Sequence, residues 1–306
     1  MKKERKAVWT KHLAGRVGFL LLGTVMFVGS YGLVMTGLTR LLLALGTERF
    51  GSEMVNSVPT IHRSMCLTMP ITWAIYAPVR FVASTVGNPL YALVFVLIAA
   101  SFFVGPLFCG WLCPAGGLIE HLSRLVPARL KYGLQGKIDP APLRYGFLAG
   151  WILVAAPIWR GTQITSICCS NCNFTWTENI WNAAFGDFYG FIGLSSAGLI
   201  TFALWFLVLG IFIKGGRGWC IFLCPAGALM NISHFLGKHL SFTRKLKVKK
   251  EKCTFCGICV EECPTLALKI NEKSEKTLNI NYHVCNICLD CVKLCPMEAL
   301  EYSKIC

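Results

Sequence analysis

The feature that most constrains this chain is a doubled cysteine run between Cys253 and Pro296. It reads C-T-F-C-G-I-C-V-E-E-C-P and then, from Cys285 onward, C-N-I-C-L-D-C-V-K-L-C-P. Each half has the spacing C-x2-C-x2-C-x3-C-P that ligates a [4Fe–4S] cluster, with the fourth cysteine serving the other cluster. The run therefore predicts two clusters with exchanged ligands, held by Cys253, Cys256, Cys259 and Cys295 and by Cys285, Cys288, Cys291 and Cys263.

Two zinc ribbons are the alternative interpretation of this run, because C-x2-C pairs also bind zinc. Zinc sites close with four local ligands in two pairs, and they need no repeated Cys-Pro ending. Both halves of this run end on Cys-Pro, at Pro264 and Pro296. The pattern therefore favours a small α+β ferredoxin domain of the bacterial two-[4Fe–4S] type, over residues 253–306.

The rest of the chain is too apolar for an ordinary soluble globule. Apolar residues make up 55% of the 306 residues, and the mean hydropathy is +0.57. A bilayer crossing needs about 20 apolar residues. We expect an α-helical membrane protein with about four transmembrane helices, within residues 17–39, 89–108, 145–158 and 188–213. Residues 40–88 are mixed and indicate an interfacial or re-entrant segment. The run 145–158 is short, so either the flanking Arg144 and Arg160 snorkel or the helix lies in a thinned region of the bilayer.

The predicted organisation is a basic N-terminus (1–16), a membrane domain (17–243), a basic linker (244–252) and the ferredoxin-like domain. The formal charge of +15 is concentrated beside the apolar runs. Four crossings leave 20 of the Lys and Arg before Cys253 on the side of the N-terminus and the cysteine run, against five on the other side. This positive-inside bias predicts a multi-pass protein of the inner (cytoplasmic) membrane, with its ferredoxin domain in the cytoplasm. No nucleic-acid partner is expected.

Two further cysteine pairs share the form C-x3-C-P-A-G, and each begins where a predicted span ends. They are Cys109–Cys113 and Cys220–Cys224. An i, i+4 spacing on a helix puts both thiols of a pair on one face. Three interpretations remain open: packed structural thiols, contact surfaces for a partner subunit, or joint ligands of a further metal centre, most simply a third iron–sulfur cluster.

Together these motifs resemble the NapH-type membrane ferredoxins. The resemblance covers roughly residues 89–296 and rests on C-G-W-L-C-P, W-C-I-F-L-C-P and the ferredoxin repeat. NapH-type proteins are regarded as quinol dehydrogenase membrane components of periplasmic nitrate reduction, and the NosR and CcoG relatives share the cysteine pattern. The resemblance implies electron transfer between the quinone pool and redox partners. It supports the eight ferredoxin cysteines as ligands and marks the two C-x3-C-P pairs as functional.

The chain departs from the NapH pattern in its predicted outer loop. Cys66, Cys168, Cys169 and Cys172 all fall on the outer side of the predicted topology. Disulfides are the default there, and a redox-active dithiol or a metal site is the alternative. The six histidines show no regular pairing within a span, so most are expected at the surface or the interface, and haem b ligation is only weakly indicated.

The expected function is electron transfer through two [4Fe–4S] clusters, with quinone as the diffusible partner. A third iron–sulfur centre joins them only under the third interpretation of the C-x3-C-P pairs. Further expected partners are the lipid bilayer and other redox subunits or a soluble electron carrier. The alternative is a maturation or regulatory factor that reduces a metal or a disulfide for assembly of another enzyme. No nucleophile–base pair, phosphate loop or dinucleotide fingerprint occurs. We therefore expect a quinol dehydrogenase-type subunit rather than a stand-alone enzyme.

Overall fold

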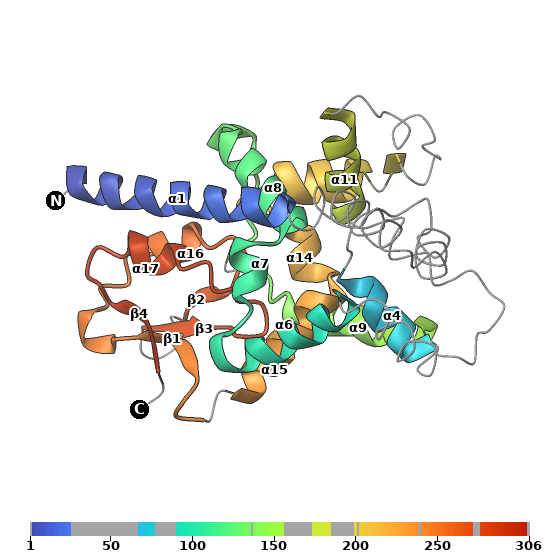
Figure 1. Ribbon diagram of the computed structural model, residues 1–306. Coiled ribbons are helices and arrows are strands. Elements are labelled where there is room, and N and C mark those ends of the chain that lie inside the picture. Colours follow the sequence, from blue (N-terminus) through green and yellow to red (C-terminus); the bar gives the residue numbers. More distant parts are fainter. Residues whose placement is uncertain are drawn as a thin grey trace, which may run out of the picture.

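A computed structural model describes residues 2–25, 67–76, 90–135, 137–155, 173–184, 199–200, 202–237, 240–271 and 276–304. A helical part contains the two C-x3-C-P turns, and a small α+β domain contains the doubled cysteine run (Figure 1). The N-terminal helix α1 lies beside the α+β domain, on the side where α16 and α17 are found. The predictions for Cys66, Cys168, Cys169, Cys172, and most of the first span fall outside the described residues.

The helical part consists of short helices joined by tight turns. Its elements are α1 (Lys2–Thr24), α4 (Thr68–Tyr76), α6 (Leu90–Val104), α7 (Leu107–Trp111), α8 (Pro114–Leu125), η2 (Ala128–Leu130), α9 (Ala141–Ala155), α11 (Asn173–Ala184), η5 (Phe202–Ile211, a π-helix), α14 (Gly218–Phe222) and α15 (Pro225–Leu236).

No single helix among the described residues is both long and apolar enough to cross a bilayer. Residues Leu93–Val104 and Leu107–Leu125 reach the required length and hydropathy together, but they are bent by 98° at the break between them. Gly105 causes this break with a φ of +75°, and Pro106 follows it. The four predicted spans therefore stay a prediction.

The two cysteine turns fold as copies of one unit. Each copy has a five-residue helix, α7 or α14, followed by a twelve-residue helix, α8 or α15. The second cysteine of each pair is the N-cap residue, with nearly equal dihedral angles: φ −65° and ψ 113° at Cys113, φ −68° and ψ 110° at Cys224. Proline follows at the first helical position, where a missing N–H costs no hydrogen bond.

Large apolar side chains point outward from several helices of this part. They lie on α1, α6, α9 and η5 and include Phe19, Leu21, Leu22, Val25, Phe95, Val96, Phe103, Ile152, Leu153, Leu204 and Val208. Helix α11 packs against α8 and η5. Its Trp176 is 3% exposed and lies 4.7 Å from Phe202, ring centre to ring centre.

The α+β domain has two antiparallel two-stranded sheets. Strand β1 (Arg244–Val248) pairs with β4 (Leu300–Lys304), and β2 (Leu268–Asn271) pairs with β3 (Thr277–Ile280). Helices α16 (Ile258–Glu261) and α17 (Asp290–Leu294) carry the third cysteine of each half and pack together. Residues 244–252, which the sequence pattern predicted as a linker, supply strand β1 and the short helix η7 (Lys250–Lys252). The domain therefore begins at Arg244 rather than at Cys253.

Candidate metal centres

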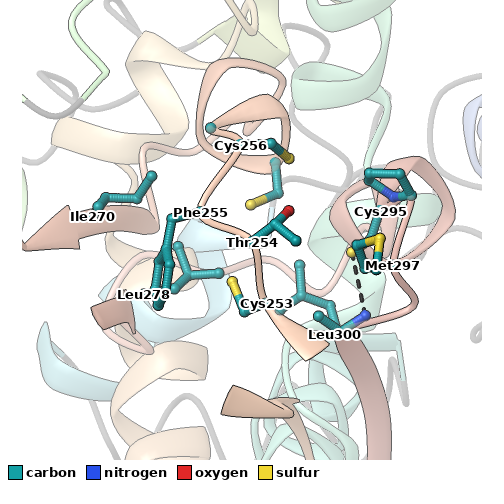
Figure 2. Close-up of a pocket in the computed structure, with 13 residues that line it drawn as sticks. Cys253, Thr254, Phe255, Cys256, Ile270, Leu278, Cys295, Met297 and Leu300 are labelled. Atoms are coloured by element: carbon teal, nitrogen blue, oxygen red, sulfur yellow. Dashed lines mark hydrogen bonds between the residues drawn. The ribbon is translucent and has the colours of Figure 1, made fainter. Parts of the chain in front are cut away.

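The first predicted ligand set lines one cavity of the α+β domain. Cys253, Cys256, Cys259 and Cys295 surround about 350 Å³ of space, together with apolar side chains that include Ile270 and Leu278 (Figure 2). Three of these cysteines come from the first half of the repeat, and Cys295 comes from the second half. The fold therefore brings together the four residues that the spacing had grouped.

The second predicted set lines a separate cavity of about 340 Å³. Cys263, Cys285, Cys288 and Cys291 face it, and all four are buried. Burial raises the pKa of Cys285 to about 12. A thiol of this kind becomes a ligand when a metal displaces its proton.

The two halves of the repeat share their unusual backbone angles. Left-handed residues occur at three positions in each half, and these positions are equivalent when the two cysteine runs are aligned. Such angles are uncommon outside glycine, so their repetition indicates a conformation that the ligand loop requires. The pairs are Phe255 and Ile287, Gly257 and Leu289, and Leu266 and Glu298.

The last of these pairs directs a backbone N–H group at a cysteine sulfur. The N–H of Ala267 donates to Cys263 Sγ at 3.3 Å, and the N–H of Ala299 donates to Cys295 Sγ at 3.3 Å. In each half the donor directly follows the left-handed residue. Hydrogen bonds to ligand sulfurs are one of the means by which a protein sets a cluster's potential.

The donor chemistry of both cavities fits a cubane. A cubane takes one thiolate on each iron, so its ligands stand further apart than those of a single ion. No group of three or more His, Cys, Asp or Glu side chains in the described ranges could hold one metal ion. Asn286 also lines the second cavity, and its buried amide has no hydrogen-bond partner within the described structure. Four cysteine sulfurs suit zinc as well as a cubane, so it is the separation of the ligands in the described structure that argues against the zinc alternative.

The two C-x3-C-P turns bring their four thiols together. Cys109 interacts electrostatically with Cys113, Cys220 and Cys224, and its Sγ donates to Met230 Sδ at 3.5 Å. The turns approach so closely that a Cβ atom placed on Gly116 would lie 2.9 Å from Cys220 Sγ of the other turn. Three of these cysteines pack in one apolar cluster with Met230. This convergence agrees with the third-centre interpretation.

Two arginines flank the four thiols. Arg144 is 4% exposed, its Nη1 donates to the backbone oxygen of His283 at 3.0 Å, and it forms no ion pair with a carboxylate of the described residues. Its charge faces Cys224 and Cys109. On the other side, Nη1 of Arg217 donates to the backbone oxygen of Cys109 at 2.5 Å. Of the two alternatives that the sequence left open, snorkelling does not hold for Arg144, because its side chain is buried toward the thiols; Arg160 lies outside the described residues.

The first cysteine turn also touches the second ligand set. The indole N–H of Trp111 donates to the backbone oxygen of Ile287 at 3.1 Å. A Cβ on Gly110 would collide with the backbone oxygen of Asn286 and lie 3.3 Å from the Cα of Cys288. In turn, Cys291 of the second set interacts electrostatically with Cys259 of the first. The second ligand set therefore adjoins both the first C-x3-C-P turn and the first ligand set. Of the twelve described cysteines, Cys256 of the first set is the exposed one.

Three of the described histidines have partners that the sequence did not indicate, and His62 and His239, for which the same surface or interface position was considered, lie outside the described residues. His234 is fully buried, and its Nδ1 lies 2.7 Å from Nζ of the buried Lys245. The side chain of His12 is 5% exposed and contacts Asp290. The ring of His283 lies against Tyr145, with Nδ1 at 2.7 Å from the phenol oxygen. Periodicity along the chain could not reveal these positions, because each depends on a partner from another element.

Comparison with known proteins supports the cluster assignment. A family described as "4Fe-4S binding domain" matches twice, at residues 87–133 and 197–243, which are the two cysteine turns with their preceding helices. A second family of the same description matches residues 246–269. The chain thus contains 4Fe–4S ferredoxin-type domains. The repeated match also includes all four C-x3-C-P cysteines.

Similar curated proteins carry names from electron transport. The chain is 26% identical over 183 residues to electron transport protein YccM of Escherichia coli, covering 56% of this chain but only 45% of that protein. It is 26% identical over 219 residues to the methylamine utilization ferredoxin-type protein MauN of Methylorubrum extorquens, covering 69% of this chain and 63% of MauN. An uncharacterized protein of Methanocaldococcus jannaschii, MJ0750, is 22% identical over 202 residues, covering 64% and 74%. No solved structure matches.

Proposed function

We propose that this chain is a membrane-anchored iron–sulfur protein that passes electrons between the quinone pool and a redox partner. The comparisons support iron–sulfur electron transport at the level of its domains. One observation carries the proposal further: the second ligand set adjoins both the first C-x3-C-P turn of the helical part and the first ligand set, whose Cys256 is exposed. When bound there, [4Fe–4S] clusters supply one-electron transfer.

Each cysteine group has a proposed role. Cys109, Cys113, Cys220 and Cys224 hold the centre nearest the membrane. The set with Cys288 holds the middle centre, and the set with Cys256 holds the centre that exchanges electrons with a partner protein, because Cys256 is exposed. The chain itself aligns the three groups through Trp111, Gly110 and the packing of α16 on α17.

The third centre is favoured over the two other interpretations of the C-x3-C-P cysteines. Contact surfaces for a partner would be exposed, whereas these thiols are partly buried in an apolar cluster. Neutral structural thiols would leave the buried charge of Arg144 uncompensated, at a cost of several kcal/mol. Four thiolates around an iron–sulfur core carry the negative charge that a buried arginine requires.

A bilayer is the proposed surrounding of the helical part. Its exposed side chains on α1, α6, α9 and η5 are largely apolar and span several elements. Large apolar side chains left exposed on several helices indicate contact with lipid or protein. The charge bias of the sequence then favours an inner-membrane protein with the α+β domain in the cytoplasm.

NapH-type quinol oxidation is the specific assignment that we propose, on the motifs of both cysteine turns and the ferredoxin repeat. A role in maturation of another redox enzyme is the alternative. It rests on Cys168, Cys169 and Cys172, which lie outside the described residues.

Iron content tests the proposal. Purified full-length protein, reconstituted without air, should hold about twelve iron, as three cubanes require. Cys113→Ser and Cys224→Ser should each lose about four iron, and the double variant should lose no more, because either change removes a required thiolate. Cys306→Ser, outside all three groups, is the matched control.

Two results would contradict the proposal. Wild-type protein with about eight iron, and single variants with unchanged iron and unchanged quinol oxidation, would leave the C-x3-C-P cysteines as packing residues. A zinc-filled α+β domain without a cubane EPR signal after reduction would refute the iron–sulfur assignment itself.

A further inference from the structure

We propose that Arg16 of the N-terminal helix is a positioning residue that raises the reduction potential of the centre held by Cys263, Cys285, Cys288 and Cys291. It acts through a buried ion network that joins this set to the first C-x3-C-P turn. The inference rests on the proposed function only in requiring a cluster in the second ligand set, and it does not require the third centre.

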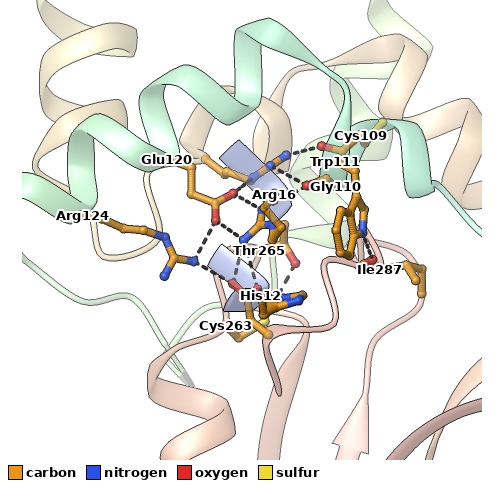
Figure 3. A network of polar contacts seen from close by, with 12 residues as sticks. His12, Arg16, Cys109, Gly110, Trp111, Glu120, Arg124, Cys263, Thr265 and Ile287 are labelled. Carbon is orange, nitrogen blue, oxygen red and sulfur yellow. Dashed lines mark hydrogen bonds and ion pairs between the residues drawn. The ribbon is translucent and has the colours of Figure 1, made fainter. Parts of the chain in front are cut away.

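Arg16 is 1% exposed and binds two carboxylates from different parts of the chain (Figure 3). Its Nη1 and Nη2 donate to Oε1 and Oε2 of Glu120 on α8, at 2.6 and 2.8 Å. Its Nη1 also donates to Oδ2 of Asp290 on α17 at 2.9 Å. Asp290 precedes the ligand Cys291 directly. One guanidinium group therefore fixes a ferredoxin helix to the helix that follows the first cysteine turn.

The same network reaches the C-x3-C-P thiols. Arg16 Nη2 donates to the backbone oxygen of Gly110 at 3.0 Å. Arg217 donates through Nε to Glu120 Oε2 at 2.5 Å and through Nη1 to the backbone oxygen of Cys109 at 2.5 Å. Glu120 is thus shared between the two arginines. A network that spans both cysteine groups sets their separation.

The network keeps a net positive charge. Three guanidinium groups, including that of Arg124, face the two carboxylates of Glu120 and Asp290, and His12 adds no negative charge. Burial by itself would raise the pKa of Glu120, but Arg217, Arg16 and Arg124 outweigh it and hold the pKa well below its ordinary value. Both signs of charge in the network are therefore present at neutral pH.

This positive charge lies where it acts on a cluster. Arg16 interacts electrostatically with Cys288 of the second set, where its positive charge opposes the negative charges of Asp290 and Glu120. A cubane held by four thiolates is negative and becomes more negative on reduction, so a nearby positive charge favours the reduced form. The effect is large where water is excluded, because charge interactions strengthen as the local dielectric constant falls. Net charge near a cluster is one determinant of its potential.

Redox titration followed by EPR tests the inference in full-length, reconstituted protein. The signal that Cys288→Ser removes belongs to the second set, and the signal of the set with Cys256 is the internal reference. Arg16→Gln should lower the midpoint potential of the second-set signal. Arg16→Lys, which keeps the positive charge, should have a midpoint potential close to that of the wild type. Glu120→Gln, which removes a negative charge from the same network, should raise it.

Arg129→Gln is the matched control, because it removes an arginine charge from an exposed position shortly after α8. A shift in Arg16→Gln no larger than in this control would overturn the inference. Midpoint-potential shifts of the same sign in Arg16→Gln and Glu120→Gln would also overturn the inference. The two variants change the charge in opposite directions, so shifts of one sign would indicate a structural disturbance instead of a charge effect. If Arg16→Gln binds no iron, the same measurement is made on Arg124→Gln. Arg124 binds the same two carboxylates, and its side chain is 23% exposed, so its replacement disturbs the fold less. The midpoint potential of the second set should fall in Arg124→Gln, by less than the fall expected for Arg16→Gln.

The outcome separates this inference from the proposed function. Wild-type protein with about eight rather than about twelve iron removes the third centre but leaves the second-set potential measurable. If every variant has full iron content and unchanged midpoint potentials, Arg16 does not set the potential of the second set. The proposed function is unaffected by that result.

Discussion

At the scale of single residues, Gly116 shows how closely the two cysteine turns approach one another. A Cβ atom at this position would lie 2.8 Å from Arg217 Nη1 and 2.9 Å from Cys220 Sγ. Arg217 cannot move away freely, because it is bound to Glu120 and to the backbone of Cys109. One methyl group would therefore displace a thiol of the proposed third centre.

We predict that Gly116→Ala loses about four iron per chain while the two ferredoxin clusters remain. Gly146→Ala on α9 is the control, because its Cβ would meet nothing within 4 Å. Alanine is a better helix former than glycine, so helix propensity alone would favour both variants. Iron content per chain and visible cluster absorption are measured for Gly116→Ala and Gly146→Ala. Full iron content in Gly116→Ala would mean that Cys220 does not need its present position.

At the scale of elements, both duplications repeat their geometry but differ in their contacts. Glu120 on α8 and Asn231 on α15 occupy equivalent positions in the two copies of the cysteine turn, and both are buried. Glu120 binds arginines, whereas the Asn231 amide donates to the backbone oxygens of Tyr282 and Cys285 at 2.7 and 2.8 Å. Both copies thus hold the segment with the second ligand set, the first copy through an ion network and the second through amide hydrogen bonds to the backbone.

The ferredoxin repeat offers an element-scale prediction at its turn before α16. Gly257 has a φ of +80° and open space around its missing Cβ, and Leu289 takes the equivalent position with a φ of +63°. Gly257→Ala should therefore destabilise the domain by about 1 kcal/mol through backbone conformation alone. Gly257→Asn should cost less, since asparagine tolerates this conformation better. The temperature at which visible cluster absorbance bleaches compares the variants, and an unchanged temperature in Gly257→Ala would contradict the prediction.

At the scale of the whole molecule, the arrangement across a bilayer decides which partners can reach each cysteine group. The proposed topology has Arg129 on the cytoplasmic side and residues 161–187 outside. Trp176 in that outer segment is buried against Phe202, so it is unsuitable as a labelling position. Ala184, at the end of the same helix, is exposed.

We predict that an impermeant thiol reagent labels Ala184→Cys in intact cells and labels Arg129→Cys only after the membrane is opened. The background protein has serine at Cys66, Cys168, Cys169 and Cys172, so that the outer native thiols do not react. Helix α11 packs against α8, which belongs to the segment assigned to the cytoplasmic side, so this contact opposes an outer position of residue 184. Labelling of position 184 only after the membrane is opened would place α11 on the side of α8 and contradict the four-span topology. Labelling in the reverse pattern, or protection of both positions in opened membranes, would contradict the four-span topology.

The sequence by itself determined the composition of each cysteine group. Ligand spacing is local information, and the repeated C-x2-C-x2-C-x3-C-P run is enough to assign Cys295 to the first set and Cys263 to the second, as the two cavities group them. The sequence also showed that the two C-x3-C-P turns are copies of one motif, each after an apolar run, but it left open whether their cysteines share one centre.

Only the tertiary structure decided what surrounds these groups. Arg16 meets Glu120 and Asp290, which lie far from it along the chain. Arg144 turns inward to the thiols, although a snorkelling side chain was one of the two alternatives that the short apolar run beside it left open. No periodicity records such contacts, because the partners lie on elements that are distant in the chain. A buried charge is stable only where the fold supplies its counter-charge, and that balance exists only after α1, α8, α14 and α17 have packed together.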